Sequence, residues 1–497
     1  MSSPPIPIHI LSKSTFLRGC QCPKSLYLYK KNPELRGEIS DSQQMIFDTG
    51  TNVGILARDL FPGGVDASPI DTFHYQDSVL LTQELIKKKT KIIYEACFQF
   101  EGVLCAVDIL VLDGKKWKCY EVKSSVEVKE VNFLDASLQY YVLTNSGINV
   151  DDISIVHINN QYVREGELDL KRLFTIESVK DEVLERQSSI KEKIEVLKSV
   201  VASKTIPASD IGPHCSDPYT CDFITHCWSH IPEVSVFDLV RLKSTKKFDL
   251  YNDGIINLKD LPIDYQLTDG QQMQVECYLQ NKSFIDKQSI KAFLSDLSYP
   301  IYFLDFETMN PAVPLFNGTK AYQQLPFQYS LHFKGERNGE IKHLEFLAQA
   351  NHEDPRLLLI ETLLQATANK GTILTYNQTF EITMLKQLAI AFPKYEREIE
   401  ERISRVADLM IPFQKRWYYV PAMNGSYSIK AVLPSIIPEM SYDHLEIGDG
   451  GTASAAFMSL YRNTNQEEVN KIRIALLEYC KLDTYAMVKL LEHLENI

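Results

Sequence analysis

The sequence predicts an α/β protein with two domains and a connector between them. The chain has 497 residues, which is too long for one hydrophobic core at roughly 100–200 residues per domain. Short β-rich runs alternate with helical segments in both halves, and irregular chain rich in proline and cysteine separates the halves. We therefore expect one domain at residues 1–231, a connector at 232–290 and a second domain at 291–497.

Each expected element follows from a local pattern. In the first domain, GVLCAVDILVLDGKKWKCYEVKSS is typical of two strands joined at an Asp113-Gly114 turn. A long helix is expected over about 177–203, because its apolar residues recur at spacings of 3, 4 or 7. In the second domain, PIYFLDF and TILTY are typical of strands, and IRIALLEYCKLDTYAMVKLLEHL is typical of a closing helix.

The composition is that of an ordinary globular protein. The 52 basic and 65 acidic residues give a net charge of −13, which argues against a protein that coats nucleic acid with an overall basic surface. Binding of nucleic acid in one local groove stays possible. The ten cysteines are too sparse for a disulfide scaffold. Because the sequence shows neither a targeting segment nor an apolar run of about 18 residues, we expect a cytoplasmic protein without a membrane partner.

The hairpin of the first domain carries two carboxylates and a lysine. Side chains alternate along a strand, so Glu121 and Lys123 share one face. A four-residue loop would place Asp108 opposite Glu121, about 5 Å away across the ladder. Carboxylates beside an ammonium group suit a divalent cation and an attacking water. A solvated charge pair on an exposed strand is the alternative interpretation.

Four cysteines form a second candidate site. Three of them are separated by five residues each in proline-containing chain beyond the long helix, and the fourth lies far upstream. Four thiolates can hold a tetrahedral zinc ion or an iron–sulfur cluster. The lack of paired C-x-x-C knuckles favours a cluster over zinc, for which His214 and His226 are possible further ligands. The cysteines are Cys22, Cys215, Cys221 and Cys227.

The segments CPKSLYL, VDIL, EVKSS and LQYY, followed by the late cysteines, resemble the RecB-like branch of the PD-(D/E)xK nucleases across roughly residues 10–230. In particular they are similar to its iron–sulfur members. The resemblance implies that Asp108 and Glu121 bind metal at a catalytic centre and that Lys123 is the catalytic lysine. It also implies that Gln139 and Tyr140 lie beside the site, and that the four cysteines hold a [4Fe–4S] cluster.

One position departs from this family. Its members often carry a metal-binding histidine in a G-x-x-V-H segment, where GTNVG has Gly54. Glu95, in YEACF, is the candidate to compensate. The family fold is therefore better supported than full activity in this domain.

The second domain carries four acidic residues and a tyrosine in three separate segments. Asp305 and Glu307 lie on one face of an apolar strand, where ionised side chains need a metal or partners. Tyr479 and Asp483 share one face of a helix. TYNQTFEITML brings Asn377 and Glu381 towards the end of the first strand. Together the carboxylates can hold two Mg²⁺ or Mn²⁺ ions about 4 Å apart, and Tyr479 can orient a water. The alternative interpretation is that Tyr479 and Asp483 are ordinary helix residues and that Glu381 is a surface charge.

These motifs resemble the DnaQ-like (DEDD) exonucleases of the RNase H-like fold, across about residues 299–495. The resemblance implies a mixed sheet and Asp305, Glu307, Glu381 and Asp483 as metal ligands, with Asp305 and Tyr479 at the catalytic centre. Glu381 stands where the family normally has an aspartate. The segments SYSIKAVLP and IGDGGTASAAF are similar to uncharacterised bacterial proteins that fuse a RecB-like nuclease to an RNase H-like domain.

The connector resembles a degenerate helix-hairpin-helix. That resemblance implies sequence-independent contacts to phosphate through Lys243, Lys246 and Lys247. A structural linker with a solvated basic face is an equal alternative.

The expected function is that of a metal-dependent nuclease that hydrolyses phosphodiester bonds in DNA. End processing, repair or defence against mobile DNA is the expected setting, with 3′→5′ polarity implied by the second resemblance. RNA is an open alternative substrate. The competing hypotheses are a non-catalytic nucleic-acid-binding scaffold and a nuclease in which only the C-terminal domain is active.

Overall fold

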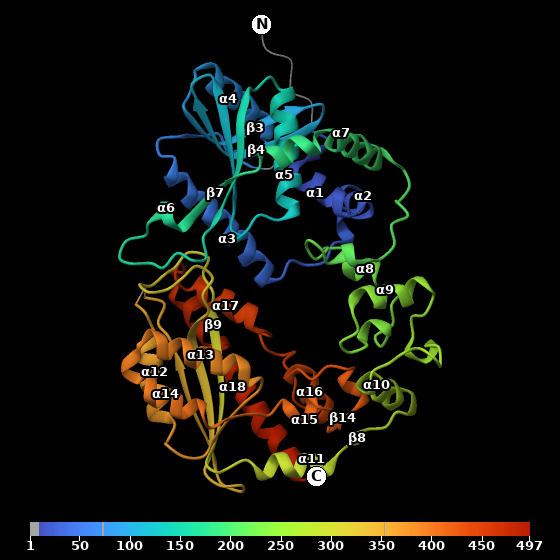
Figure 1. Cartoon of the computed structure of the whole chain (residues 1–497), viewed down its shortest axis with the longest axis vertical. Helices are drawn as coiled ribbons and strands as arrows, with labels where there is room; N and C mark the ends of the chain where they lie inside the picture. Colours follow the sequence, from blue (N-terminus) through green and yellow to red (C-terminus); the bar gives the residue numbers. More distant parts are fainter. Residues whose placement is uncertain (1–8, 72–73, 352) are drawn as a thin grey trace. The chain divides into compact units, whose positions relative to one another are not determined.

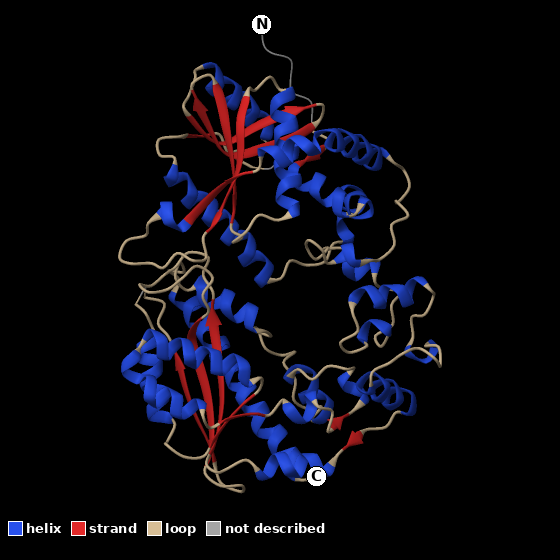
Figure 2. Cartoon of the chain, viewed as in Figure 1, coloured by secondary structure: helices blue, strands red, loops and turns tan. Residues whose placement is uncertain are grey.

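The computed structural model describes residues 9–71, 74–351 and 353–497, and it is a mixed α/β structure, as the sequence predicts. Contacts divide the chain into two compact units (Figures 1 and 2). The first comprises Met1–His230 and Ala312–Tyr322, and the second comprises Ile231–Pro311 and Gln323–Ile497. The sequence did not indicate that Ala312–Tyr322 belongs with the first unit.

The first unit is built on a seven-stranded sheet with the order β2-β3-β4-β5-β6-β7, and β1 pairs with β4. Its antiparallel β4–β5 hairpin is the one expected from the sequence, and it closes on an Asp113↔Lys116 pair. The loop is therefore two residues long, shorter than the four considered, but the register is the same. The strands are β1 (Leu11–Ser12), β2 (Val65–Asp66), β3 (Ile92–Phe100), β4 (Val103–Asp113), β5 (Lys116–Lys123), β6 (Val150–Ile158) and β7 (Phe174–Ser178).

Helices cover this sheet because their apolar faces need a partner. Helix α5 packs against β3, β4 and β6, and α7 packs against α5. The α7 helix lies where the 3, 4 and 7 spacing predicts it and buries Val183, Ile190, Ile194 and Leu197. The helices are α1 (Lys13–Gln21), α2 (Pro23–Lys31), α3 (Asp41–Ala57), α4 (Tyr75–Lys87), α5 (Glu130–Asn145), α6 (Leu170–Leu173), α7 (Lys180–Ala202) and α8 (Ile224–Cys227).

A loop from the C-terminal half completes the first unit. Residues 312–322 follow β9 (Ile301–Met309) in the sequence. Ala312 and Ala321 of this loop belong to the same apolar core cluster as Tyr162. The guanidinium of Arg164 donates to the carbonyls of Pro314 and Leu315 at 3.0 and 2.9 Å. The hydroxyl of Tyr322 donates to the carbonyl of Ser124, directly after β5. Hydrogen bonds and apolar burial thus attach this loop to the strand end that carries Lys123.

The second unit contains a five-stranded mixed sheet with the order β11-β10-β9-β12-β13. Strands β9, β10 and β11 pair antiparallel, whereas β12 and β13 run parallel to β9 and to each other. A separate ribbon pairs β8 with β14. The strands are β8 (Phe284–Ile285), β10 (Leu325–Lys334), β11 (Ile341–Leu347), β12 (Thr372–Thr375), β13 (Val406–Asp408) and β14 (Tyr418–Tyr419).

The central strand β9 separates two different environments. Its residues Tyr302, Leu304 and Phe306 join an apolar core with residues of α12, α13 and α14. The alternate residues, which include Asp305 and Glu307, face the other side, where α17 and α18 pack against β9. The strand alternation read from the sequence thus separates the apolar core from the acidic face.

The helices of the second unit include the closing helix predicted from the sequence, which begins earlier than expected, at Gln466. Among the described residues, no helix combines the length and apolar character needed to cross a membrane. The helices are α9 (Ser244–Asn252), α10 (Asp269–Gln280), α11 (Lys287–Ser295), α12 (Arg356–Ala366), α13 (Gln378–Ala391), α14 (Glu396–Ile403), α15 (Ile411–Gln414), α16 (Ile429–Ile436), α17 (Gly450–Ser459) and α18 (Gln466–Glu495).

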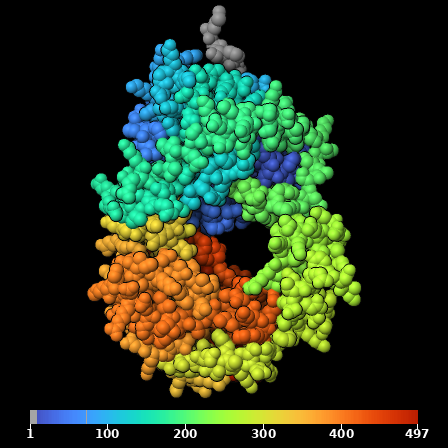
Figure 3. All heavy atoms as spheres, viewed as in Figure 1, coloured from blue at the N-terminus to red at the C-terminus, as the bar shows by residue number. Residues whose placement is uncertain are grey.

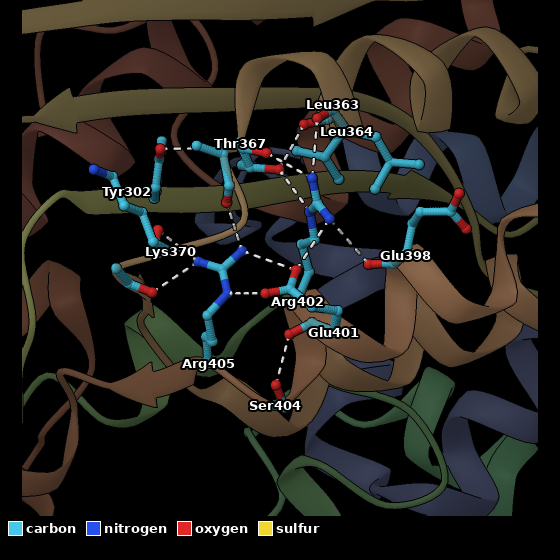
Figure 4. Close-up of polar contacts among 12 residues, drawn as sticks. Tyr302, Leu363, Leu364, Thr367, Lys370, Glu398, Glu401, Arg402, Ser404 and Arg405 are labelled. Atoms are coloured by element: carbon cyan, nitrogen blue, oxygen red, sulfur yellow. Dashed lines mark hydrogen bonds and ion pairs between the residues drawn. The ribbon is translucent and has the colours of Figure 1, made fainter.

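Two arginines fix the turn between α12 and β12 (Figure 4). The last carbonyls of a helix have no partner within the helix. Arg402 is 6% exposed and donates to the carbonyls of Leu364 and Thr367 at 3.2 and 2.7 Å. Arg405 donates to three later carbonyls of the same turn, those of Ala368, Lys370 and Gly371. The arginines therefore set where β12 begins, and β12 leads into α13.

Replacing Arg402 by methionine should destabilise the second unit. The substitution keeps the buried stem but leaves two buried carbonyls without a donor, and we expect a loss of about 3 kcal/mol in the free energy of unfolding. Urea denaturation followed by circular dichroism measures this loss. Arg397→Met, on an exposed position of the same helix, α14, is the matched control and should change stability little. Equal stability of the two variants would contradict the role given to Arg402.

Candidate metal-binding sites

The second unit gathers acidic side chains around β9. Asp305 and Glu307 lie two residues apart on this strand, and Glu307 is 6% exposed. Their carboxylate oxygens and the thiol of Cys480, on α18, all lie within 4.8 Å of one another. Burial, together with the charge of Asp483, raises the pKa of Asp305 well above its usual range. Burial and both aspartates do the same to the pKa of Glu307.

Two further carboxylates predicted from the sequence lie beside this pair. Glu381 is 1% exposed in the first turn of α13, and its Oε2 atom has no hydrogen-bond partner among the described residues. Burial and the neighbouring Asp305 raise its pKa to about 9. Asp483, on α18, accepts a hydrogen bond from the hydroxyl of Tyr442 at 2.6 Å, and burial raises its pKa to about 6. All four predicted acids thus lie near one another, but among the described residues Glu381 and Asp483 do not belong to the group of ligand atoms within 4.8 Å that Asp305, Glu307 and Cys480 form.

Sequence reasoning missed three polar groups of this site: Lys430, Tyr442 and Cys480. The ammonium of Lys430 donates to the carbonyl of Gly448 at 2.6 Å and to the hydroxyl of Tyr479 at 3.2 Å. Lys430 lies in SYSIKAVLP, a segment noted only for its likeness to other proteins. Its position on the short helix α16 carries no local signal that would link it to α18 or β9.

The donor set fits a divalent cation. Four carboxylates share a buried site, while Lys430 is the basic group whose charge acts on Asp305, Glu307 and Asp483. Within the described residues, no lysine or arginine nitrogen forms an ion pair with any of the four. Several buried anions without ion-paired cations are costly. Carboxylate oxygens are the ligands that Mg²⁺ and Mn²⁺ prefer, so such an ion would remove this cost.

Asn377 has a structural position at the start of α13. It is the N-cap residue with a left-handed φ of 81°, and its backbone N–H donates to Asp408 Oδ1 at 2.9 Å. Asp408 ends β13 and also accepts from the backbone of Met410. These bonds fix the first turn of α13, which carries Glu381.

The first unit contains the other predicted cluster, and here the acids are paired with lysines. Glu121 and Asp135 are 2% and 1% exposed. Lys123 donates to Glu121 Oε1 at 2.6 Å and to Asp135 Oδ2 at 2.7 Å. Gln139 donates to Glu121 Oε2 at 2.8 Å and to Asp135 Oδ1 at 3.0 Å. Lys13, which the sequence did not single out, donates to Glu121 Oε1 at 2.7 Å.

The charges of this cluster compensate one another. Burial and Asp108 raise the pKa of Glu121, but the ammonium groups of Lys123 and Lys13 outweigh them, so that this pKa lies below its usual value. Burial lowers the pKa of Lys13, but Asp135, Glu121 and Asp108 raise it further, to well above its usual value. Glu121 therefore stays ionised beside two ammonium groups, whereas burial raises the pKa of Asp108.

Asp108 lies at an irregularity of the sheet beside these groups. Ile109 pairs with Tyr120, so Asp108 is opposite Glu121, as the sequence predicts. Cys105, Val107 and then Leu110 belong to the same core, so the strand alternation shifts by one residue at Asp108. Asp108 Oδ2 accepts from the backbone N–H of Val122 at 2.6 Å. Irregular strands of this kind often re-aim a side chain beside an active site.

Gly54, which stands where the resembled family often has a metal-binding histidine, has free space around it. A Cβ atom at Gly54, on α3, would meet nothing within 4 Å. Glu95 lies opposite Asp108 on β3 with a left-handed φ of 52°, and its carboxylate pairs with Arg58 at 3.1 Å. Burial raises the pKa of Glu95, whose neighbours also include Lys13 and Glu121. Glu95 thus reaches the cluster, whereas Tyr140 packs against the apolar core.

The four predicted cysteines line one cavity of the first unit, together with His214. Cys22 is the N-cap residue of α2, directly before Pro23. In the described chain, no three of the four sulfur atoms lie within 4.8 Å of one another. A tetrahedral zinc ion with Zn–S bonds of about 2.3 Å needs sulfur atoms about 3.8 Å apart. His226, the other histidine considered, is not among the residues that line the cavity.

The three connector lysines differ in their surroundings. Lys243 and Lys246 are exposed, and residues 232–280 form the yellow-green part of the surface in Figure 3. The ammonium of Lys247 instead donates to the carbonyl of Phe237, and burial lowers its pKa. Lys247 therefore has a structural contact that the sequence did not reveal. Helix α9 is followed by a turn at Asp253-Gly254 and a short 3₁₀ turn before α10 begins.

The chain is similar to a domain family of unknown function and to two uncharacterized proteins. A domain of unknown function, DUF2779, matches residues 302–428. The uncharacterized protein UU173 of Ureaplasma parvum serovar 3 is 26% identical over 276 residues, which are 50% of this chain and 38% of UU173. The uncharacterized protein MG366 of Mycoplasma genitalium is 22% identical over 241 residues, which are 45% of this chain and 36% of MG366. The chain thus matches less than half the length of either relative.

The buried acids of the second unit predict a pH-dependent stability of the metal-free protein. A carboxyl whose pKa is raised on folding stabilises the fold fully below its unfolded value of 4.5, and this contribution is lost as the pH rises through its folded value, about 9 for Glu381. The melting temperature of protein treated with a chelator should therefore fall across this interval. Glu381→Gln should make the fall shallower, because the amide carries no charge.

Glu396→Gln, on an exposed position of α14, is the control and should leave the pH profile unchanged. Mn²⁺ at about 100 times its dissociation constant should stabilise the wild type by about 2.7 kcal/mol. Identical pH profiles for wild type and Glu381→Gln would show that Glu381 is not held among buried charges.

Proposed function

We propose that the protein is a metal-dependent nuclease that hydrolyses phosphodiester bonds in DNA. The single observation that carries this proposal is the burial of Glu307, Glu381 and Asp483 close to Asp305, with no hydrogen-bond partner for Glu381 Oε2 among the described residues. A buried acidic site of this kind has no evident structural use, because apolar residues would stabilise the sheet better. The mixed sheet order agrees with the RNase H-like resemblance.

The proposed reaction uses the residues of the second unit in distinct roles. Bound divalent cations would polarise the phosphate and the attacking water and neutralise the developing charge. Asp305, Glu307, Glu381 and Asp483 would hold these ions. Tyr479, whose hydroxyl accepts from Lys430, would orient the water. The oxygen of water forms the new bond to phosphorus, one ester P–O bond breaks, and the leaving oxygen takes up a proton.

The first unit would contribute a second nuclease site and a cofactor. Asp108 and Glu121 are its candidate metal ligands, and Lys123 is its candidate catalytic lysine. The four cysteines line one cavity, which supports a shared metal centre, and the lack of paired C-x-x-C knuckles favours a [4Fe–4S] cluster over zinc. Such a cluster would join residues from the start and the end of this unit.

The family match spans part of the second site. DUF2779 covers residues 302–428, which include Asp305, Glu307 and Glu381 but not Lys430, Tyr479 or Asp483. The relatives are uncharacterised, so activity and substrate rest on the geometry of this chain.

Cleavage assays with matched variants test the proposal. End-labelled single-stranded DNA, duplex DNA and RNA are incubated with the protein and Mg²⁺ or Mn²⁺. We expect DNA cleavage that a chelator abolishes, and Asp305→Asn should reduce cleavage by the second unit by roughly 10³-fold or more, because it removes a metal ligand. Glu121→Gln tests the first unit, and Glu396→Gln is the control.

Each outcome assigns the function. If Asp305→Asn abolishes all cleavage and Glu121→Gln does not, the cleavage by the wild type belongs to the C-terminal unit alone. Cleavage of RNA but not DNA would replace the proposed substrate. A wild type that binds DNA and cleaves nothing would establish the scaffold hypothesis and contradict the nuclease.

The cysteine site has its own test. Protein purified without oxygen should absorb visible light and contain about four iron atoms per chain, as a [4Fe–4S] cluster requires. Cys221→Ser should lower the iron content, whereas Cys277→Ser, in the second unit, should not. A colourless protein with stoichiometric zinc would contradict the cluster.

A further inference from the structure

We propose that Lys13 is a further catalytic residue of the first unit, and that its ammonium binds a non-bridging oxygen of the scissile phosphate. This inference rests on the proposed nuclease function and adds to it a residue outside the predicted Asp108, Glu121 and Lys123 set. The ligand that Lys13 recognises is thus the phosphodiester anion itself.

The sheet topology places Lys13 at the cluster. Strand β3 pairs with β4 along Val103–Val111, so that edge of β4 is occupied. Strand β5 ends at Lys123, and β1 takes the remaining edge through the pairs Leu11↔Val103 and Ser12↔Leu104. Lys13 follows directly as the first residue of α1, whose start is fixed by a capping box at Ser12. Two paired strands and a capped helix therefore aim this side chain.

The contacts of Lys13 duplicate those of Lys123. Both ammonium groups donate to Glu121 Oε1, at 2.7 and 2.6 Å. Both also approach Asp135 Oδ2, at 4.0 and 2.7 Å. Glu121 Oε1 thus accepts hydrogen bonds from two ammonium groups. Lys123 retains a close second acceptor in Asp135, whereas Lys13 has, among the described residues, the longer 4.0 Å contact as its one ion pair besides Glu121.

The lysine and carboxylate side chains of the cluster differ in exposure. The side chains of Glu121 and Asp135 are each 2% exposed, whereas those of Lys13 and Lys123 are 26% and 24% exposed. Part of each lysine side chain therefore reaches the surface beside carboxylates that do not.

This arrangement suits hydrolysis of an anion. The phosphate gains negative charge as water adds to phosphorus, and a preorganised cation stabilises that charge more than it stabilises the ground state. Once Glu121 coordinates a cation, its Oε1 atom is a weaker acceptor for Lys13. The ammonium can then donate to the phosphate from nearly the same position, while Lys123 stays on Asp135 beside the attacking water.

The test uses the full chain with Asp305→Asn as the parent, so that cleavage reports on the first unit. Lys13→Met, Lys13→Arg and the control Lys191→Met, on an exposed position of α7, are compared with this parent. Three quantities are measured: the kcat for DNA cleavage, Mn²⁺ affinity by calorimetry, and the melting temperature. Glu121→Gln in the same parent identifies the Mn²⁺ signal of the first unit.

We expect Lys13→Met to lower kcat by about 10²–10³-fold while Mn²⁺ binds more tightly, because Glu121 loses a competing cation. Lys13→Arg should recover part of the rate, and Lys191→Met should match the parent. Opposite changes in rate and metal affinity are not expected of a lysine that only supports the fold. If Lys13→Met fails to fold, Lys13→Gln takes its place.

Three results would overturn the role of Lys13 alone: an unchanged kcat, a kcat that rises with metal affinity, or a joint fall of kcat, Mn²⁺ affinity and melting temperature. A kcat that rises together with metal affinity would show that Lys13 competes with the metal ion for Glu121 and inhibits the site. A parent that neither cleaves DNA nor shows a Glu121-dependent Mn²⁺ signal would instead overturn the proposed activity of the first unit, and the role of Lys13 with it.

Discussion

Carboxylates that lie inside a sheet impose the main constraint on both units. An ionised carboxyl removed from water needs cations or hydrogen-bond donors, or it takes up a proton. Glu121 is 2% exposed, and Glu307, Glu381 and Asp483 are 6%, 1% and 7% exposed. The lysines, tyrosines and backbone amides of the two candidate sites are arranged around these groups.

The two units meet this constraint in different ways. In the first, Lys13, Lys123 and Gln139 neutralise and bond Glu121 and Asp135, and the pKa of Glu121 stays low. In the second, Lys430 bonds to a carbonyl and a tyrosine rather than to the acids, whose pKa values are raised. In the first site, Lys13 and Lys123 therefore compensate the charges of Glu121 and Asp135 without a bound ion, whereas Asp108 has no ion pair among the described residues and burial raises its pKa. The site of the second unit is the one that a bound metal ion would stabilise most.

Structural elements distant in sequence hold these sites in place. Arg402 and Arg405 fix the turn before β12, and the bonds of Asn377 and Asp408 then fix the first turn of α13 with Glu381. In the first unit, the 312–322 loop binds the chain just after Lys123. This loop continues from β9, the strand that carries Asp305 and Glu307. One continuous segment therefore links the strand of one site to the strand end of the other.

The sequence alone determined the α/β class, the β4–β5 register and the helix α7, because strand and helix periodicities are local properties of the chain. It also singled out Asp305, Glu307, Glu381 and Asp483, since acids in apolar surroundings stand out in any segment. Tertiary structure alone decided that Lys13, Asp135, Lys430 and Cys480 join these sites. Each lies in an ordinary helical segment, and its contacts span long sequence separations that no local pattern encodes. Tertiary structure also decided the surroundings of Lys247. The sequence predicted an exposed lysine, but its ammonium donates to the carbonyl of Phe237, ten residues away.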